Sequence, residues 1–457
     1  LFRKPWIERL PDYISSGKKN SDLSIEDFSG ALSDHEIKTF KELVKCGLFP
    51  DGIRLHSHQV EMLRKVMAGS NCIITSGTGS GKTESFLLPL FAQLSKEFTH
   101  WSRPGTKPDT VDNWWKANDS LKPRQVVNTS TYTLSEASAQ RLHETRPAGV
   151  RALILYPMNA LVEDQMSRLR KALDSDDTRM WLSCESNGNA IFFGRYNGVS
   201  PVPGELKTFT TNGTKLNSNK VNQLKQQLRI IEEDANRVEQ YIINNNIQPK
   251  ESKDLKSFFQ RLDGAEMRSR FDMQLSPPDI LITNYSMLSI MLMRQIDSGI
   301  FENTRAWLAG EDLSEEKRDA EKENRLFHLI IDELHLYRGT QGTEVAYLLK
   351  LVLNRLGLHP HHSQVRILAS SASLEPGDDA SKKFLEDFFG IDSRIKPFEI
   401  IEGRNNPVSE LSEKIIKIPQ EPFAAISRNY TGDLLSPDFV TSCEAAAEAL
   451  AQLSGIP

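Results

Sequence analysis

The chain has 457 residues, enough for two or three domains, and its 39% hydrophobic and 26% charged residues exclude a disordered chain. No run of 18 apolar residues and no signal-peptide pattern occurs, so we expect a cytoplasmic protein without a membrane span. The net charge of −5 neither indicates nor excludes a nucleic-acid partner, because a basic groove can exist on an acidic protein. The four cysteines form no C-x-x-C pair, so any metal would be held by oxygen ligands.

Short apolar runs alternate with helical patterns along most of the chain. The runs are NCIIT (71–75), ALILYP (152–157), AIFFG (190–194), DILIT (279–283), HLIID (328–332) and RILAS (366–370). Helical patterns follow most of them, as at 83–94, 160–173 and 342–356. This alternation is typical of βαβ units, and it predicts an α/β fold with a parallel sheet flanked by helices.

The composition divides the chain into three parts. We expect a helical N-terminal extension over 1–50, one α/β lobe over 51–376, and a weakly patterned tail or linker over 377–457. Two long insertions interrupt the lobe: an irregular one at 98–148 and a helical one at 205–270. The lysines of the second insertion alternate with acids, so it is either a solvated helical hairpin or a clamp on DNA.

The segment TSGTGSGKTESF (75–86) follows the first strand and precedes a helix. In that context the backbone N–H groups of a glycine-rich loop bind phosphates. Lys82 would neutralise the β and γ phosphates of ATP, and the Thr83 hydroxyl would join the shell of a Mg²⁺ ion. The general loop pattern has glycine where this chain has Ser76. The candidate nucleotide-binding residues of the loop are Thr78, Gly79, Ser80, Gly81, Lys82, Thr83 and Glu84.

A pair of acids ends the strand in FHLIIDELH. Asp332 would hold Mg²⁺ through its water shell, and Glu333 would orient or deprotonate the attacking water. Alternatively, the two acids merely cap the next helix. Downstream of a phosphate-binding loop in the same sheet, we predict that Asp332, Glu333 and Lys82 are catalytic, together with His335 of the same motif.

At D-E-L-H the sequence resembles the DExH helicases and translocases of superfamily 2, which implies a RecA-like lobe. In this superfamily the phosphate loop accepts a small residue at the position of Ser76. The resemblance implies that Gln59, upstream of the loop, reads the adenine edge; the alternative is a solvated helix glutamine. It also implies that SSASL (370–374), through Ser371 and Ser373, couples the ATP state to the grip on a strand.

Two further segments resemble the nucleic-acid motifs of the same superfamily. PMNALVEDQ (157–165) is similar to a motif that grips the nucleic-acid backbone, which implies contacts from Asn159 and Gln165. DILITNYSML (279–288) is similar to a second such motif, with Thr283 and Asn284 at its tip.

Over about residues 50–375 the chain resembles large bacterial DExH helicases of the MrfA and Hrq1 type, and anti-phage defence helicases. GRYNGVSP (194–201) and DELHLYRGTQG (332–342) are among the segments that carry this likeness. It implies that Arg195, Tyr196, Arg268 and Arg270 line the strand path or couple it to ATP; the alternative is that they brace loops. The implied partners are single-stranded or forked DNA and proteins of defence or repair.

Motors of this class hydrolyse ATP between two lobes, and arginines of the second lobe complete the site. No Q-x-x-G-R-x-G-R-like segment follows SSASL, and QRLDGAEMRSR (260–270) precedes DELH, so we reject it as the arginine finger. The chain begins with Leu1, so we expect a piece of a longer protein that hydrolyses ATP poorly alone. One alternative is another P-loop class, such as a transporter ATPase, a GTPase or a small-molecule kinase, but the L-S-G-G-Q signature and the N-K-x-D base reader are both absent. The other alternative is a scaffold that does not hydrolyse ATP and recruits partners.

Overall fold

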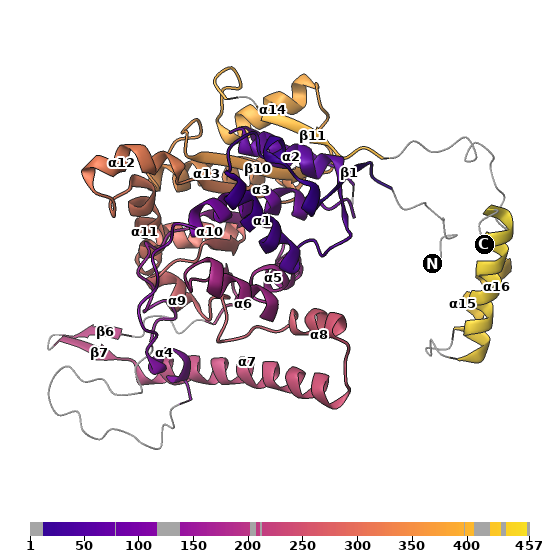
Figure 1. Cartoon of the computed structure of the whole chain (residues 1–457), viewed down its shortest axis with the longest axis horizontal. Helices are drawn as coiled ribbons and strands as arrows, with labels where there is room; N and C mark the ends of the chain where they lie inside the picture. The colour runs from indigo at the N-terminus through magenta and orange to yellow at the C-terminus, as the bar shows by residue number, and fades with distance from the viewer. Residues whose placement is uncertain are drawn as a thin grey trace. The chain divides into compact units, whose positions relative to one another are not determined.

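The computed structural model describes residues 12–77, 79–116, 138–201, 207–210, 213–396, 398–405, 421–430 and 436–454 (Figure 1). The chain divides into two compact units, residues 1–405 and 406–457. The second unit holds α15 (Glu421–Asn429) and α16 (Pro437–Ser454). These two helices pack on each other, with the rings of Tyr430 and Phe439 5.4 Å apart. No described helix is long and apolar enough to cross a membrane.

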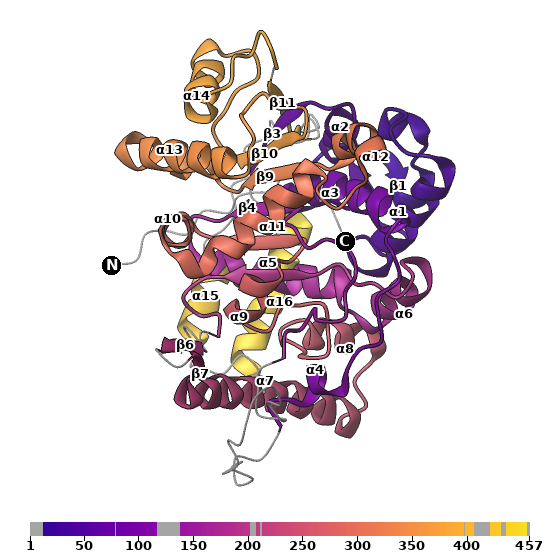
Figure 2. The ribbon, with the colours of Figure 1, turned by 90° about the vertical axis from the view of Figure 1, so that its left-hand side faces the viewer.

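A parallel sheet of seven strands forms the centre of the first unit (Figure 2). Its order is β11-β3-β10-β9-β4-β8-β5, and every described pairing is parallel. The strands are β3 (Asn71–Thr75), β4 (Ala152–Leu155), β5 (Phe193–Tyr196), β8 (Ile280–Thr283), β9 (Phe327–Ile331), β10 (Val365–Ser371) and β11 (Phe398–Glu402). The α/β prediction is confirmed, and all six predicted runs supply strands. β11 lies beyond residue 376, where we expected the lobe to end, so the sheet extends further than that boundary.

Helices cover both faces of the sheet because alternate side chains of its strands point to opposite sides. Ile154 of β4 joins the core of one face and Leu155 that of the other. The first face carries α1 (Asp34–Gly47), α2 (Ser57–Met67), α3 (Lys82–Phe98), α5 (Asn159–Leu173) and α6 (Asp176–Glu185). The second face carries α9 (Arg270–Leu275), α10 (Tyr285–Met293), α11 (Ser298–Ala309), α13 (Gly339–Arg355) and α14 (Asp379–Phe389).

The segments outside these layers are short or inserted. Before α2 the chain forms an antiparallel pair, β1 (Ser15–Lys19) and β2 (Arg54–His56), and 3-10 turns at Asn20–Asp22 and Ile25–Phe28. Helix α12 (Glu315–Glu321) precedes β9. The described part of 98–148 contains α4 (Asp109–Asn113). The region 205–270 contains the hairpin β6 (Lys207–Thr210) and β7 (Gly213–Leu216), then α7 (Ser218–Asn244) and α8 (Pro249–Lys256).

The two insertions share a small core of their own. Figure 1 shows α4 beside the long helix α7, at one side of the unit. Trp114 and Trp115, which follow α4, are buried against α7 in a cluster with Val221, Leu224, Leu228 and Leu262. The Trp115 indole also donates to Glu232, at 3.1 Å. This small core therefore attaches helix α7 of the second insertion to the segment after α4 of the first.

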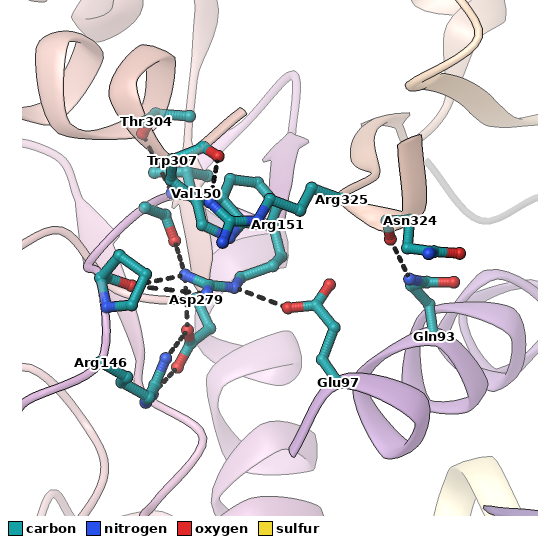
Figure 3. Close-up of polar contacts among 12 residues, drawn as sticks. Gln93, Glu97, Arg146, Val150, Arg151, Asp279, Thr304, Trp307, Asn324 and Arg325 are labelled. Carbon is teal, nitrogen blue, oxygen red and sulfur yellow. Dashed lines mark hydrogen bonds and ion pairs between the residues drawn. The ribbon is translucent and has the colours of Figure 1, made fainter. Parts of the chain in front are cut away.

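A buried ion cluster lies where β4 and β8 begin, at the amino ends of the strands (Figure 3). Asp279 accepts two hydrogen bonds of 2.7 Å from Arg146, and it also forms an ion pair with Arg151 at 3.2 Å. Arg151 also donates to Glu97 near the end of α3, at 3.1 Å. The backbone N–H of Phe192 donates to Asp279 at 2.8 Å. The cluster therefore joins two central strands to α3, the helix that begins at the phosphate loop.

Candidate nucleotide site

The phosphate loop joins β3 to α3 with a sharply turned backbone. Gly81 has a φ of +74°, and a Cβ atom there would lie 2.4 Å from the amide nitrogen of Gln59. The left-handed backbone favours glycine, and an added Cβ atom would push the Gln59 amide away from the Gly81 carbonyl. Ser76 lies within hydrogen-bonding distance of Ser80, with 2.6 Å between their hydroxyl oxygens, so it braces the loop from inside. Thr78 lies outside the described residues.

Residues at the start of α2 contact the backbone carbonyl groups of the phosphate loop. The Gln59 amide donates to the Gly81 carbonyl at 3.2 Å and accepts from the backbone N–H of His56 at 2.9 Å. Nε2 of His58 lies 2.8 Å from the Ser80 carbonyl oxygen, and burial lowers the pKa of His58 to about 4. Gln59 is only 2% exposed. Both ends of its amide are occupied here, so it is not a solvated glutamine, and its adenine-reading role stays a prediction.

The acid pair lies beside the loop, at the carboxyl end of β9. Nζ of Lys82 lies 3.0 Å from Oε1 of Glu333. Glu333 has a left-handed backbone, with a φ of +51°, which is uncommon for a residue with a Cβ atom. It precedes the 3-10 turn Leu334–Leu336, but its side chain makes no capping hydrogen bond there. The helix-cap alternative therefore fails for Glu333.

Ser370, which we did not predict, connects the acids to the neighbouring strand β10. Its hydroxyl donates to the Asp332 carboxylate and accepts from the backbone N–H of Glu333 at 2.9 Å. Burial raises the pKa of Asp332, which is 6% exposed. A serine carries no chemical signature in a sequence, and only the pairing of β9 with β10 places this hydroxyl between the two acids.

The rest of SSASL contacts the segment after the acids. Nδ1 of His335 lies 3.3 Å from the Glu333 carboxylate, and it accepts from the backbone N–H of Ala372 at 3.4 Å. The Arg338 guanidinium donates to the Ser373 hydroxyl, at 2.5 Å. Ser371 is buried, and its hydroxyl accepts from the backbone N–H of Ser373 at 3.3 Å. Residues 333–338 and 370–373 are therefore connected by side chains at several points.

The helix α5 contributes two side chains to the nucleotide side of the site. Gln165 is buried and donates to the Thr83 hydroxyl at 3.0 Å. Our prediction put Gln165 on nucleic acid, whereas the structure places it against the phosphate loop. The Glu84 carboxylate forms an ion pair with Arg168. Glu84 thus fixes α5 to the loop, and its side chain is not free for a nucleotide in this arrangement.

The predicted nucleic-acid residues lie at the carboxyl ends of β4, β5 and β8, but several are engaged with the protein. Thr283 is fully buried and donates to the Tyr196 carbonyl at 2.7 Å, so it has no surface for a strand. Asn284 accepts from the backbone N–H of Met287 at 2.8 Å and caps α10. Arg195 is paired with Glu163. Asn159 begins α5, and its side chain is not described.

Tyr196, Arg268 and Arg270 are all buried, which favours the loop-bracing alternative over a place on the strand path. Arg268 donates to the carbonyls of Leu262 and Val111, each at 2.6 Å, and lies over the Trp115 ring. The Arg270 guanidinium carbon lies 5.0 Å from the centre of the Tyr196 ring. Arg268 therefore holds the two insertions together.

The donor set fits a magnesium ion. Among the described residues no three His, Cys, Asp or Glu side chains gather into a protein metal cage. Mg²⁺ needs no such cage, because it keeps several waters and takes phosphate oxygens with one or two protein ligands. The Thr83 hydroxyl and the Asp332 carboxylate are oxygen ligands of the required kind. Lys396, outside the site, has a pKa lowered to about 8 by burial.

Comparisons with known proteins agree with this geometry. A family model described as DEAD/DEAH box helicase matches residues 56–191. The Druantia protein DruE of Escherichia coli (strain UMEA 4076-1) is 29% identical over 443 residues, which cover 90% of this chain and 20% of that protein. The chain thus spans about a fifth of the length of the curated relative it matches.

Crystal structures of the DUF1998 helicase MrfA are also similar in part. The DNA-bound structure is 16% identical, with a TM-score of 0.40, over 86% of this chain and 29% of that one. The structure with DNA and AMPPNP is 16% identical, with a TM-score of 0.41, over 88% and 32%. The fold assignment rests on the order of the sheet and not on these likenesses. The phosphate loop, DELH and SSASL meet at one edge of that sheet, and residues 56–191 match the model of the DEAD/DEAH box helicases.

Proposed function

We propose that the protein is an ATP-driven nucleic-acid helicase or translocase, and that this chain is its first motor lobe. The meeting of Lys82 and Glu333 at 3.0 Å is the observation that carries the proposal. It brings a phosphate-binding cation and a candidate general base to one point, although 251 positions separate them in the sequence. SSASL adjoins both acids, which is where a segment that reports the ATP state would lie.

The proposed reaction begins with an exchange of partners at Lys82. The phosphates of ATP would compete with Glu333 for the Lys82 ammonium, and the freed carboxylate would then orient or deprotonate the attacking water. Thr83 and Asp332 would hold Mg²⁺, which neutralises charge on the β and γ phosphates when it is bound. The Ser370 hydroxyl would hold the Asp332 carboxylate and the Glu333 backbone in place during this exchange.

The nucleic acid, which we propose is single-stranded or forked DNA, would run across the carboxyl ends of β4, β8 and β5. Met158 is 55% exposed and Val199 64% exposed in the loops after β4 and β5. These exposed loops are the surface that the strand would contact, with its phosphates held in part by backbone N–H groups. A second RecA-like lobe would supply arginines to the ATP site, and proteins of defence or repair would be further partners.

The proposal is tested by ATP turnover of the complete protein with and without single-stranded DNA. We expect DNA to raise the rate at least tenfold. Glu333→Gln should still bind ATP but lose turnover, by about 10³-fold or more for a candidate base of this type. Glu344→Gln, an exposed acid on α13, is the matched control and should behave like the wild type. An ATP turnover rate that does not change with DNA, or turnover that persists in Glu333→Gln, would overturn the proposal.

A further inference from the structure

Two tyrosines at the carboxyl edge of the sheet are buried with their hydroxyls unpartnered among the described residues. Tyr156 is 0% exposed and Tyr337 1% exposed, and neither hydroxyl has a hydrogen-bond partner there. Buried polar groups are nearly always hydrogen-bonded, because an unpartnered one has lost its water without replacement. A phenylalanine would fill the same space without that penalty, so the two hydroxyls call for an explanation.

Tyr156 and Asp332 are the residues that follow the register partners Leu155 and Ile331 on neighbouring strands, and Tyr337 comes five positions after Asp332. Tyr156 is the first residue after β4, and the Leu155 carbonyl before it accepts from the backbone N–H of Asp332 at 3.0 Å. Tyr337 follows Asp332 by one short turn, and its backbone N–H donates to the Leu334 carbonyl at 3.0 Å.

The two rings belong to opposite faces of the sheet. The Tyr156 ring packs in the core under α3 and α5, and the Tyr337 ring in the core under α10 and α13. Burial raises the pKa of both phenols, and the nearby Asp332 carboxylate raises it further in each case. The Asp332 carboxylate is therefore a charged neighbour of both phenols, whose rings pack in the cores on opposite faces of the sheet.

Asp332 can accept more hydrogen bonds than it receives here. An ionised carboxylate offers about four acceptor positions, and the side-chain donor to Asp332 in the described structure is the Ser370 hydroxyl. A phenol is a suitable donor to an anionic oxygen or to a water held by it. Both hydroxyls would gain a partner if Asp332 turned, or took up ordered water, as a metal and nucleotide arrived.

We propose that Tyr156 and Tyr337 are positioning residues for Asp332, each donating to its carboxylate, or to a water on it, when Mg²⁺ and ATP are bound. This inference rests on the proposed function, because it assigns the hydroxyls to the metal side of that site. In the state without nucleotide the unpartnered hydroxyls would give no gain in stability over phenylalanine. Their contribution belongs to the loaded state.

The test compares Tyr156→Phe, Tyr337→Phe and the double variant of the complete protein. Tyr347→Phe, which removes an exposed hydroxyl on α13, is the control. Urea unfolding without nucleotide should give midpoints equal to or above that of the wild type, because removing an unpartnered buried hydroxyl is neutral or stabilising. Titration of Mn²⁺ in the presence of AMPPNP, followed by electron paramagnetic resonance, should show about five- to tenfold weaker metal binding in each Phe variant.

The outcomes separate the two proposals. Unchanged Mn²⁺ affinity in both single variants, or an equal loss in Tyr347→Phe, would overturn the positioning role. A lower urea midpoint without nucleotide would also overturn it, since the hydroxyls would then act in the unloaded fold. If the wild type binds Mn²⁺ and AMPPNP, and the variants lose that binding, but DNA does not stimulate turnover, the proposed motor function fails and the positioning role stands.

Discussion

Replacing Asp279 by asparagine tests the buried ion cluster that sets the framework of the sheet. The carboxylate has two 2.7 Å hydrogen bonds from Arg146, an ion pair with Arg151 at 3.2 Å and a 2.8 Å bond from the backbone of Phe192. Asparagine keeps the shape but loses the charge, and it turns one acceptor into a donor that faces a guanidinium. Breaking a buried pair in this way costs about 3–5 kcal/mol, so we expect a loss of about 3 kcal/mol.

Urea unfolding of Asp279→Asn, followed by circular dichroism, measures this loss. Arg237→Gln is the matched control, because its partner Asp234 lies at 2.5 Å but the two side chains are 70% and 42% exposed. Exposed pairs of this kind contribute little, so the control should change the free energy of unfolding by less than about 0.5 kcal/mol. A loss below about 1 kcal/mol in Asp279→Asn would refute the view that this cluster holds the sheet together.

The Asp279 carboxylate also makes the free energy of unfolding depend on pH in the acidic range. Burial alone would raise the pKa of Asp279, but Arg146 and the neighbouring arginines hold it well below the ordinary value of 3.8. A depressed pKa in the folded state stabilises the protein above the unfolded pKa, and this contribution fades as the pH falls below about 4. The difference between the wild type and Asp279→Asn should therefore be full at pH 7 and shrink below pH 4. An undiminished difference at pH 2 would contradict this assignment.

Three further substitutions test two residues of the nucleotide site and one arginine between the insertions. Gly81→Ala puts a Cβ atom 2.4 Å from the Gln59 amide at a left-handed backbone. It should weaken ATP binding at least tenfold in a fluorescent-nucleotide titration, and an unchanged affinity would contradict the strained geometry of the loop. Gln165→Ala removes the hydrogen bond to Thr83, so it should weaken ATP binding about threefold to tenfold and leave the affinity for single-stranded DNA unchanged. Weaker DNA binding with unchanged ATP binding would instead support the nucleic-acid role predicted for Gln165. Arg268→Met leaves the buried carbonyls of Leu262 and Val111, and the Asp112 carboxylate, without their donor. It should lower the free energy of unfolding by about 2–4 kcal/mol in urea unfolding, and DNA affinity should not change if the residue only braces the insertions.

The sheet could be predicted because most of its strands are buried on both faces. Such strands appear as short apolar runs, and NCIIT matches β3 residue for residue. β11 was missed because it is an edge strand with the sequence FEIIE, in which glutamates interrupt the apolar pattern. The antiparallel pair β1–β2 and the hairpin β6–β7 were missed because their strands are short and polar.

The phosphate loop and the acids could be located because their chemistry needs particular residue types at fixed spacing. Ser370 could not, because its function depends on which strand lies beside β9. Gln165 and Thr283 were assigned to nucleic acid by their segments, but a segment does not tell which way each side chain points. Gln165 turned to the loop, and Thr283 into the core. Arg268 was ambiguous for the same reason, since a buried arginine and a strand-binding arginine have the same letter.

The central claim is that ATP turnover at Lys82 and Glu333 drives movement along a nucleic-acid strand. The most direct measurement is displacement of a labelled strand from forked DNA by the complete protein, with ATP or AMPPNP, for the wild type and Glu333→Gln. We predict displacement only by the wild type and only with ATP, together with retained binding of the fork by Glu333→Gln. Displacement by Glu333→Gln, or by the wild type with AMPPNP, would contradict the claim.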